Sequence, residues 1–366
     1  MDIPLDKILQ KAHLGVVAGL FSRVKMADKI SFAKNISTML EAGLPLTRAL
    51  SVLERQSRNK TFKAVLAALS ADISKGDSLS AAMTKNPKIF SSLFVSMVKA
   101  GEESGGLSKS LRAVGNQLER AHLLTKKIRG AMMYPGIILT IMIGIGILML
   151  LYVVPTITEV FRSMNVTLPI STQIIIFLSD FFKHHFLLVL LGVAAVAIGV
   201  VYAVRTPVGN RAVTTVLMKL PFIGSVMKET NSARTERTLS SLLSAGVDFL
   251  IAILITEEVL QNVFYKEIMK KAEENVQKGK PISEIFLAEE KLYPAFVGEM
   301  ASIGEETGRL SEMFENVATF YENEVEQRTK DMSTVIEPVL MVVIGIAVGI
   351  FAISMLSPIY SLVDAL

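Results

Sequence analysis

Three long stretches of the chain are almost purely apolar. They cover residues 135–155, 186–204 and 338–358, and none contains Asp, Glu, Lys, Arg or His. About 20 apolar residues, rising 1.5 Å each along a helix, cross a hydrocarbon core of roughly 30 Å. The pattern therefore predicts three transmembrane helices.

The remaining sequence has helical periodicity and no strand-like alternation between hairpin turns. Apolar residues recur at intervals of three and four, which places them on one face of a helix. The clearest run comprises Ile30, Ala33, Ile36, Met39 and Leu40. We therefore expect an all-α protein.

The sequence contains an internal duplication with a constant offset of 203 positions. "AGEESGGL" at 100–107 returns as "IGEETGRL" at 303–310, and "STMLEAG" at 37–43 matches "SSLLSAG" at 240–246. Pro135 and Pro338 match at the start of two spans. A shared offset over this length indicates two copies of one unit, each a bundle of about six helices, two of them short, followed by a span. The middle span is an insertion that returns the chain to the first side.

The predicted organisation follows from these two observations. The N-terminal arm is expected to be short and amphipathic or irregular, because its apolar run is brief and lacks a convincing cleavage site for a signal peptidase. The expected segments are the arm (1–27), the first cytoplasmic bundle (28–134), the first transmembrane helix (135–155), an extracytoplasmic connector (156–185), the second transmembrane helix (186–204), a cytoplasmic linker (205–230), the second cytoplasmic bundle (231–337), the third transmembrane helix (338–358) and an extracytoplasmic tail (359–366).

Basic residues near the spans predict the orientation. Lys126, Lys127 and Arg129 precede the first span, and Arg205 and Arg211 follow the second. The connector between these two spans contains only one Arg and one Lys. Since cytoplasmic flanks carry the excess of Lys and Arg, both large bundles are expected in the cytoplasm.

Composition excludes several classes of function. Hydrophobic residues make up 51% of the chain and charged residues only 20%, as the spans require. The net charge of +4 is mild and no basic tract with interleaved aromatic residues occurs, so nothing indicates nucleic-acid binding. The absence of cysteine excludes disulfides, thiolate metal sites and cysteine catalysis.

The duplicated acidic turns allow three interpretations. Glu102 and Glu103, like Glu305 and Glu306, would repel a phosphate, and the turns lack the Gly-Lys-Ser/Thr ending of a nucleotide-binding loop. Carboxylates suit Ca²⁺ or Mg²⁺, but two adjacent acids supply too few ligands unless another loop or subunit completes the shell. We favour a helix–loop–helix joint whose acids stay solvated or favour the start of the next helix, compatible with a protein-contact surface.

Glycine and proline at matched positions are predicted structural joints. Gly43 and Gly246 follow predicted helix ends, where a left-handed residue terminates a helix. The glycines of the acidic turns allow positive φ. The predicted joints are Gly43, Gly246, Gly101, Gly105, Gly304, Gly308, Pro135 and Pro338.

No catalytic constellation or cofactor motif is present, so the chain is not expected to be an enzyme or to hold a cofactor. A small transporter or permease subunit built from duplicated halves is the alternative class. The spans argue against it, because they lack the ionisable residues that ion and solute pathways usually need. Gly345 and Gly349 form a GxxxG pattern that allows close packing of membrane helices, although glycine is common in such helices.

These features together resemble the type II secretion system F family, which includes the PilC-type proteins of type IV pilus assembly. The resemblance covers residues 28–362. It rests on "MLEAGLPLTRAL" and "LLSAGVDFLIAI", on "GEESGGL" and "GEETGRL", on "KLPFIG" at 219–224, and on "IEPVL" before the last span. Two departures are a shorter N-terminal segment than many members carry, and Val247-Asp248 in place of a proline-containing turn.

The resemblance implies a non-enzymatic platform protein of the bacterial inner membrane. It implies that the bundles contact a hexameric cytoplasmic assembly ATPase and that the spans meet pilin or pseudopilin subunits. Other inner-membrane assembly proteins and further copies of the chain are also implied as partners. It does not distinguish secretion, pilus and competence systems.

Overall fold

The computed structural model describes residues 24–163, 169–220 and 222–363, and all regular structure within these ranges is helical. Most of the predicted N-terminal arm and the last three residues of the predicted tail therefore lie outside the described residues. Two compact units divide the chain. One contains the described residues up to Lys126 together with Gly224–Val325, and the other contains Lys127–Ile223 and the residues from Glu326 onward.

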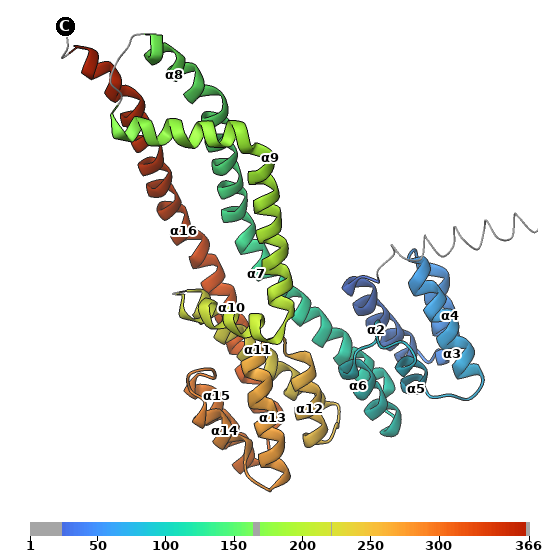
Figure 1. Cartoon of the computed structure of the whole chain (residues 1–366). Helices are drawn as coiled ribbons and strands as arrows, with labels where there is room; N and C mark the ends of the chain where they lie inside the picture. Colours follow the sequence, from blue (N-terminus) through green and yellow to red (C-terminus); the bar gives the residue numbers. More distant parts are fainter. Residues whose placement is uncertain (1–23, 164–168, 221, 364–366) are drawn as a thin grey trace, which may run out of the picture. The chain divides into compact units, whose positions relative to one another are not determined.

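The first unit contains both copies of the duplicated bundle (Figure 1). Within the described residues, each copy contributes six helices. In the first copy they are α2 (Met26–Glu41), α3 (Leu46–Gln56), α4 (Lys60–Ser74), α5 (Leu79–Thr84), α6 (Ser92–Glu103) and the beginning of α7 (Leu107–Leu148). In the second copy they are α11 (Ile223–Ser244), α12 (Phe249–Val259), α13 (Val263–Gln277), α14 (Ile282–Ala288), α15 (Ala295–Thr307) and the beginning of α16 (Leu310–Val363).

Helix boundaries repeat with the same offset as the sequence. The helices α3 and α12 match at both ends, as do α4 and α13. Matched asparagines explain one of these starts: Asn59 accepts a hydrogen bond from the N–H of Phe62, and Asn262 accepts one from Phe264. Asparagine at this position satisfies an N–H group that the first turn of a helix leaves without an acceptor. The duplication is therefore structural as well as sequential.

The first bundle closes over aromatic side chains. Phe32 of α2 packs against Phe62 of α4, with ring centroids 5.9 Å apart, and also against Phe90 and Phe94. All four side chains are buried. Aromatic rings bury large apolar areas, and edge-on contacts add a further increment, so this cluster stabilises the first core.

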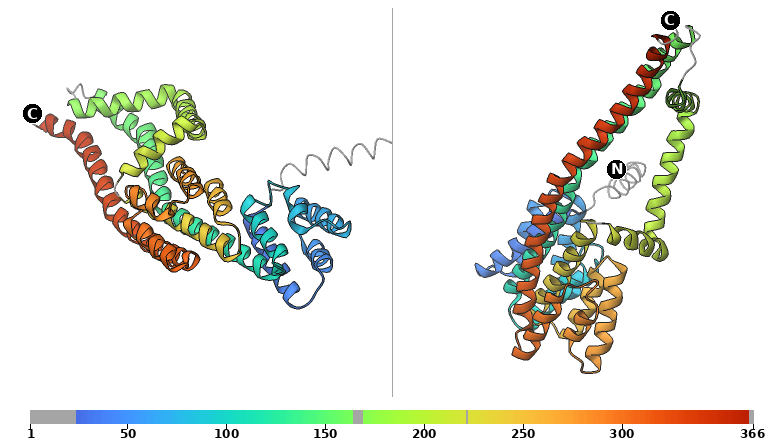
Figure 2. Two further views of the ribbon diagram at one scale, coloured as in Figure 1. Left: turned by 90° about the horizontal axis from the view of Figure 1, so that it is seen from below. Right: turned by 90° about the vertical axis from the view of Figure 1, so that its left-hand side faces the viewer.

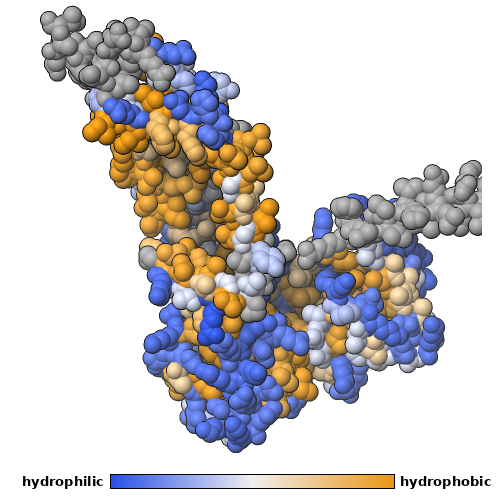
Figure 3. Space-filling model, viewed as in Figure 1, coloured by the Kyte–Doolittle hydropathy of each residue, from blue (hydrophilic) through white to orange (hydrophobic). Residues whose placement is uncertain are grey.

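The second unit contains the apolar helices (Figure 3). Two helices, Leu107–Val160 and Leu310–Leu356, are long and apolar enough to cross a membrane. A third span is obtained if the bent pair Ile170–His185 and Leu187–Val200 counts as one. The first of these ranges contains the predicted stretch 135–155, and the other two overlap most of 338–358 and 186–204. Pro135 and Pro338 lie inside continuous helices.

The helix α9 (Ile170–Arg205) is bent by 86° at His185, whose φ of −120° and ψ of 23° are not helical (Figure 2). Its first half is tied to two other helices. The Ser179 hydroxyl donates to the carbonyl oxygen of Leu150 at 2.5 Å, within the π-helix η1 (Met149–Val153), and the Thr172 hydroxyl donates to the Ser354 carbonyl of α16. A π turn interrupts the regular hydrogen bonds of an α-helix. The Ser179 hydroxyl gives one carbonyl oxygen of this turn a hydrogen-bond donor.

Two predicted connections are helical. The predicted connector contains most of α8 (Val154–Ser163) and the first half of α9, and the predicted linker contains α10 (Pro207–Lys219) and the first turns of α11. Thr206 starts α10, because its side chain accepts from the N–H of Gly209 and Pro207 occupies the first helical position. The helix α11 begins at Ile223, eight residues before the predicted start of the second bundle at residue 231.

Candidate functional site: the acidic turns and the buried polar joint

Glu102 and Glu305, the first acids of the duplicated turns, cap the two shortest bundle helices. The Glu102 carboxylate accepts from the N–H groups of Leu79 (2.5 Å) and Ser80 (3.1 Å) and from the Ser80 hydroxyl. Glu305 accepts in the same way from the N–H groups of Ile282 (2.6 Å) and Ser283 (3.4 Å) and from the Ser283 hydroxyl. These N–H groups begin α5 and α14 and have no acceptor within their own helix.

For Glu102 and Glu305, this arrangement corrects the expectation that the acids stay solvated or favour the helix that follows them. Glu102 lies at the end of α6, and the hydrogen bonds place this end beside the start of α5, which precedes α6 in the chain. The carboxylate therefore caps the earlier helix rather than α7. The reversal of direction between two packed helices produces this contact, and spacing along the sequence does not reveal it.

Glu103 and Glu306, the second acids, are exposed. Glu103 lies 3.8 Å from Lys99, and Glu306 accepts from the Ser302 hydroxyl at 3.3 Å. In the described part of the chain, no group of three or more His, Cys, Asp or Glu side chains is placed to hold a metal ion. A cation at Glu102 or Glu305 would have to replace the existing hydrogen bonds.

Glycines position both acidic turns. Gly105 and Gly308 have φ of 70° and 68°, a region that other residues rarely adopt. Gly101 and Gly304 allow close helix approach, since a Cβ on Gly101 would lie 2.4 Å from Ser110 and one on Gly304 would lie 3.0 Å from the Cα of Leu310. Of the other predicted joints, Gly43 and Gly246 have φ of 85° and 83°.

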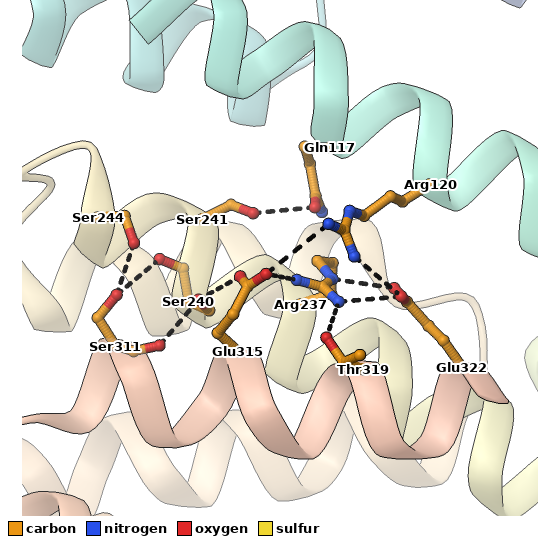
Figure 4. A network of polar contacts seen from close by, with 10 residues as sticks. All are labelled: Gln117, Arg120, Arg237, Ser240, Ser241, Ser244, Ser311, Glu315, Thr319 and Glu322. Carbon is orange, nitrogen blue, oxygen red and sulfur yellow. Dashed lines mark hydrogen bonds and ion pairs between the residues drawn. The ribbon is translucent and has the colours of Figure 1, made fainter. Parts of the chain in front are cut away.

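A buried arginine, Arg237 of α11, organises the second bundle (Figure 4). Its side chain is 5% exposed and binds Glu322 of α16 through two nitrogens, each 2.9 Å from a carboxylate oxygen. It also donates to the Thr319 hydroxyl at 2.8 Å and lies 2.5 Å from a carboxylate oxygen of Glu315. A two-pronged guanidinium–carboxylate pair fixes orientation as well as distance.

The same network reaches the first copy through α7. Arg120 lies 3.5 Å from Glu322 and 4.0 Å from Glu315. Gln117 accepts from the Ser241 hydroxyl at 2.9 Å and donates to Thr238 at 3.4 Å. The polar face of α11 therefore contacts two helices, α16 of its own copy and α7 of the other.

The charges of this network support one another. Burial alone would lower the pKa of Arg237, but hydrogen bonds and charge attraction from Glu322 and Glu315 outweigh it and raise the pKa. Burial would raise the pKa of Glu315, whereas the hydrogen bond and charge of Arg237 lower it below its usual value. Both groups are therefore charged at neutral pH.

The first copy has the same ion pair in a different setting. Lys34 and Glu119 occupy the positions that match Arg237 and Glu322, with the charged atoms 2.5 Å apart. Their side chains are 36% and 43% exposed, against 5% and 17% for the second pair. An exposed pair contributes little stability, but a buried charge that loses its partner is costly. The ion pair is therefore present in both copies, but only in the second copy is it buried, where the loss of one partner would cost stability.

Glu236, next to Arg237, is a buried acid whose carboxyl group lacks hydrogen bonds in the described structure. It is 0% exposed, and neither carboxylate oxygen has a hydrogen-bond partner among the described residues. Burial raises the pKa of Glu236 well above its usual value. Its match in the first copy is Ala33, which is also fully buried. The second copy thus places a carboxyl group where the first has a methyl group.

Other core positions follow the same trend. Thr235, Tyr265 and Tyr293 replace the phenylalanines at 32, 62 and 90. The hydroxyls of Thr235 and Tyr293 lie 2.8 Å apart, and the Tyr265 hydroxyl donates to the carbonyl of Leu292 at 2.7 Å. The second core therefore contains polar groups that depend on specific partners.

Sequence reasoning did not identify this buried polar joint. Arg237, Glu315 and Glu322 carry no motif, and charged residues on a helix usually indicate a solvated face. One signal was available: the constant offset aligns Arg237 with Lys34 and Glu322 with Glu119, so the pair is present twice. The change from lysine to arginine in the second copy suits a buried, two-pronged contact.

Comparison with known proteins identifies the class of this duplicated, membrane-spanning helical protein. The profile of "Type II secretion system (T2SS), protein F" matches residues 32–155 and again residues 237–358. The two matches coincide with the two copies of the bundle and the spans that follow them. The chain therefore belongs to the type II secretion system protein F family, a family of non-enzymatic membrane platform proteins.

Similarity to individual relatives extends over nearly the whole chain. The type IV pilus assembly protein PilC of Thermus thermophilus is 35% identical over 93% of this chain and 84% of its own length. PilC of Myxococcus xanthus is 33% identical over 94% of this chain and 83% of its own length. The type II secretion system protein F of Xanthomonas campestris is 31% identical, with 93% and 84% covered.

Replacing the capping acids tests their structural role. Glu102→Gln and Glu305→Gln each keep one acceptor oxygen but lose the charge, so each bundle should lose about 1–2 kcal/mol of stability. The effect should be larger for Glu305, because Pro281 supplies no side-chain cap to α14 whereas Ser78 caps α5. Hydrogen exchange of α5 and α14 in the full chain measures this loss of stability. Glu103→Gln and Glu306→Gln are matched controls, and equal losses in all four variants would contradict the capping role.

Titration of Glu236 should make the second bundle sensitive to pH. Because its pKa is raised on folding, its contribution to stability is complete below the unfolded value of about 4.3 and is lost as pH rises toward the folded value. The free energy of opening of α11, measured by hydrogen exchange, should therefore fall as the pH rises. Glu236→Gln should remove this slope, while the exposed Glu299→Gln should leave it unchanged. An unchanged slope in Glu236→Gln would refute the assignment.

Proposed function

We propose that this chain is the inner-membrane platform of a type IV pilus or type II secretion machine, and that it couples a cytoplasmic hexameric ATPase to the insertion of pilin or pseudopilin subunits. The observation that carries the proposal is the double family match together with similarity over more than 90% of the chain to pilus and secretion assembly proteins. Relatives of both kinds match at comparable identity, so the proposal does not choose between the two machines.

The helices suit a mechanical role. α7 has 42 residues and α16 has 54, and each continues without interruption from a bundle into an apolar span. At 1.5 Å per residue these helices are about 60 Å and about 80 Å long. A continuous helix can transmit a rotation or tilt along its axis. In this proposal, the ATPase moves the bundles and the spans pass the movement to subunits in the bilayer.

The joint described above supports the same mechanism. The Arg237 network connects α11, α16 and α7, so movement of the second bundle would also affect the first. Gly345 and Gly349 lie on an open face of α16, where a Cβ would meet no atom within 4 Å. This face remains available for close helix packing in an oligomer of the chain or with a subunit helix. The exposed acids Glu103 and Glu306 are candidates for a contact with the ATPase.

Both bundles lie in the cytoplasm in this proposal, and the segment between the first two spans lies outside, as the positions of Lys and Arg favour. The absence of cysteine makes this topology directly measurable. Ser74→Cys and Glu274→Cys should resist an impermeant thiol reagent in intact cells, and Glu159→Cys should react. Labelling of either bundle in intact cells, with Glu159→Cys protected, would reverse the orientation.

Deletion and capture test the function itself. A strain lacking the gene should assemble no filament or pseudopilus, and the wild-type gene should restore assembly. The purified full chain should capture the assembly ATPase of the same operon or genome, and Glu103→Gln with Glu306→Gln should weaken capture if these acids form the contact. The exposed Glu274→Gln is the control. Normal assembly in the deletion strain would overturn the proposal, and solute flux in proteoliposomes would favour a transporter.

A further inference from the structure

A small cavity lies between α7 and α16 in the unit that contains the apolar helices. It measures about 230 Å³ and is lined by Lys127, Gly130, Ala131, Glu326, Thr329 and Lys330. All six residues belong to the same compact unit. Gly130 leaves room on the α7 side, because a Cβ there would meet no atom within 4 Å. The volume is below that of drug-sized pockets, which suits a small polar group.

The cavity brings together two lysines that duplication placed at matched positions. Lys127 and Lys330 are 203 residues apart, the offset of the two copies. Both contact one carboxylate: Lys330 lies 3.1 Å from one oxygen of Glu326, and Lys127 contacts the other. Hydrogen bonds from Lys127 and then Lys330 lower the pKa of Glu326, so it is ionised at neutral pH. Two cations face one anion, which leaves one positive charge uncompensated.

Both lysines can still reach a further ligand. Their side chains are 44% and 74% exposed, and each ammonium group has three N–H donors, of which the Glu326 contact uses a minority. Thr329 is not available in the same way, because its hydroxyl donates to the Glu326 backbone carbonyl. The chemistry of the site is therefore that of two flexible cations around one carboxylate, open on one side.

The position along the helices places this charge at a membrane surface. Lys127 precedes the uncharged run that begins at Gly130 by three residues, and it precedes Pro135 by eight. At 1.5 Å per residue these distances are roughly 5 Å and roughly 12 Å. Lys330 precedes Pro338 by the same eight residues. The polar headgroup layer occupies roughly 5–8 Å beyond each side of the hydrocarbon core, so lysine side chains from these positions reach its phosphates.

We propose that this cavity binds the phosphate of an anionic phospholipid headgroup. The surplus lysine charge attracts the phosphate, the gap beside Gly130 admits it, and the acyl chains stay in the bilayer along the apolar surfaces of α7 and α16. Basic sites beside membrane helices are known to favour anionic lipids in this way. Glu326 competes with the phosphate for both lysines, so it weakens binding. The inference does not depend on the identity of the ATPase or of the assembled subunit.

Native mass spectrometry of the full chain in detergent tests the site, with phosphatidylglycerol, phosphatidylcholine and inorganic phosphate as separate probes. Wild-type protein should retain phosphatidylglycerol in preference to phosphatidylcholine. Lys127→Gln and Lys330→Gln should each reduce retention about fivefold, the effect of one lysine near an anionic surface. The charge-matched controls, Lys126→Gln and Lys219→Gln, each change one exposed lysine that does not line the cavity and should leave retention unchanged.

The second test looks for an increase in lipid binding, because a misfolded variant would not produce an increase. Glu326→Gln frees both lysines and should increase phosphatidylglycerol retention, whereas the neighbouring exposed Asp331→Asn should not. Equal effects in the cavity variants and their controls would show general electrostatic attraction and overturn the site. Equal retention of both lipids would also overturn it. Binding of inorganic phosphate without a preference for phosphatidylglycerol would assign the site to a soluble anion instead.

Discussion

The contact between Arg237 and Glu322 is the interaction on which the second bundle depends. α11 carries Glu229, Thr230, Asn231, Ser232, Thr235, Glu236, Arg237 and Thr238 in a buried environment, where polar groups need partners. Arg237 is the basic residue of this set, and it contacts two carboxylates and a hydroxyl. Breaking such a buried pair by removing one partner typically costs about 3–5 kcal/mol, because the remaining charge stays buried. Removing either partner should therefore weaken the packing of α11 against α16.

Duplication produced two bundles with the same helix boundaries and different interiors. The first is closed by phenylalanine, and its version of the ion pair is half-exposed. The second replaces three of those phenylalanines by threonine and tyrosine and adds Glu236, which has no hydrogen-bond partner in the described structure. An apolar core tolerates rearrangement because its contacts are not directional, whereas a polar network has few satisfied arrangements. The second bundle is consequently the more specific of the two, and it is the one that receives α7 of the other copy.

Much of the architecture could be predicted because it depends on local patterns. The constant offset located both copies, apolar length located the long apolar helices, and Gly105 and Gly308 marked positions of positive φ. The bend at His185 was not predicted, since no proline or glycine marks it. The capping by Glu102 and the burial of Arg237 were missed for a shared reason: each results from helices that meet in three dimensions, and a charged residue carries no local sign of what will cover it. Lys127 was interpreted only as a charge that flanks a span, and the structure shows that it shares Glu326 with Lys330.

A double-mutant cycle on Arg237 and Glu322 tests the central claim most directly. Arg237→Met, Glu322→Leu and the double variant are compared in the full chain, with the free energy of opening of α11 and α16 measured by hydrogen exchange. Each single change should cost about 3–5 kcal/mol, and the double variant should cost less than the sum by about 2 kcal/mol or more. Lys34→Met with Glu119→Leu, the matched positions of the first copy, should show coupling below about 1 kcal/mol. Additive effects at Arg237 and Glu322, within about 0.5 kcal/mol, would contradict the claim that their contact holds the second bundle together.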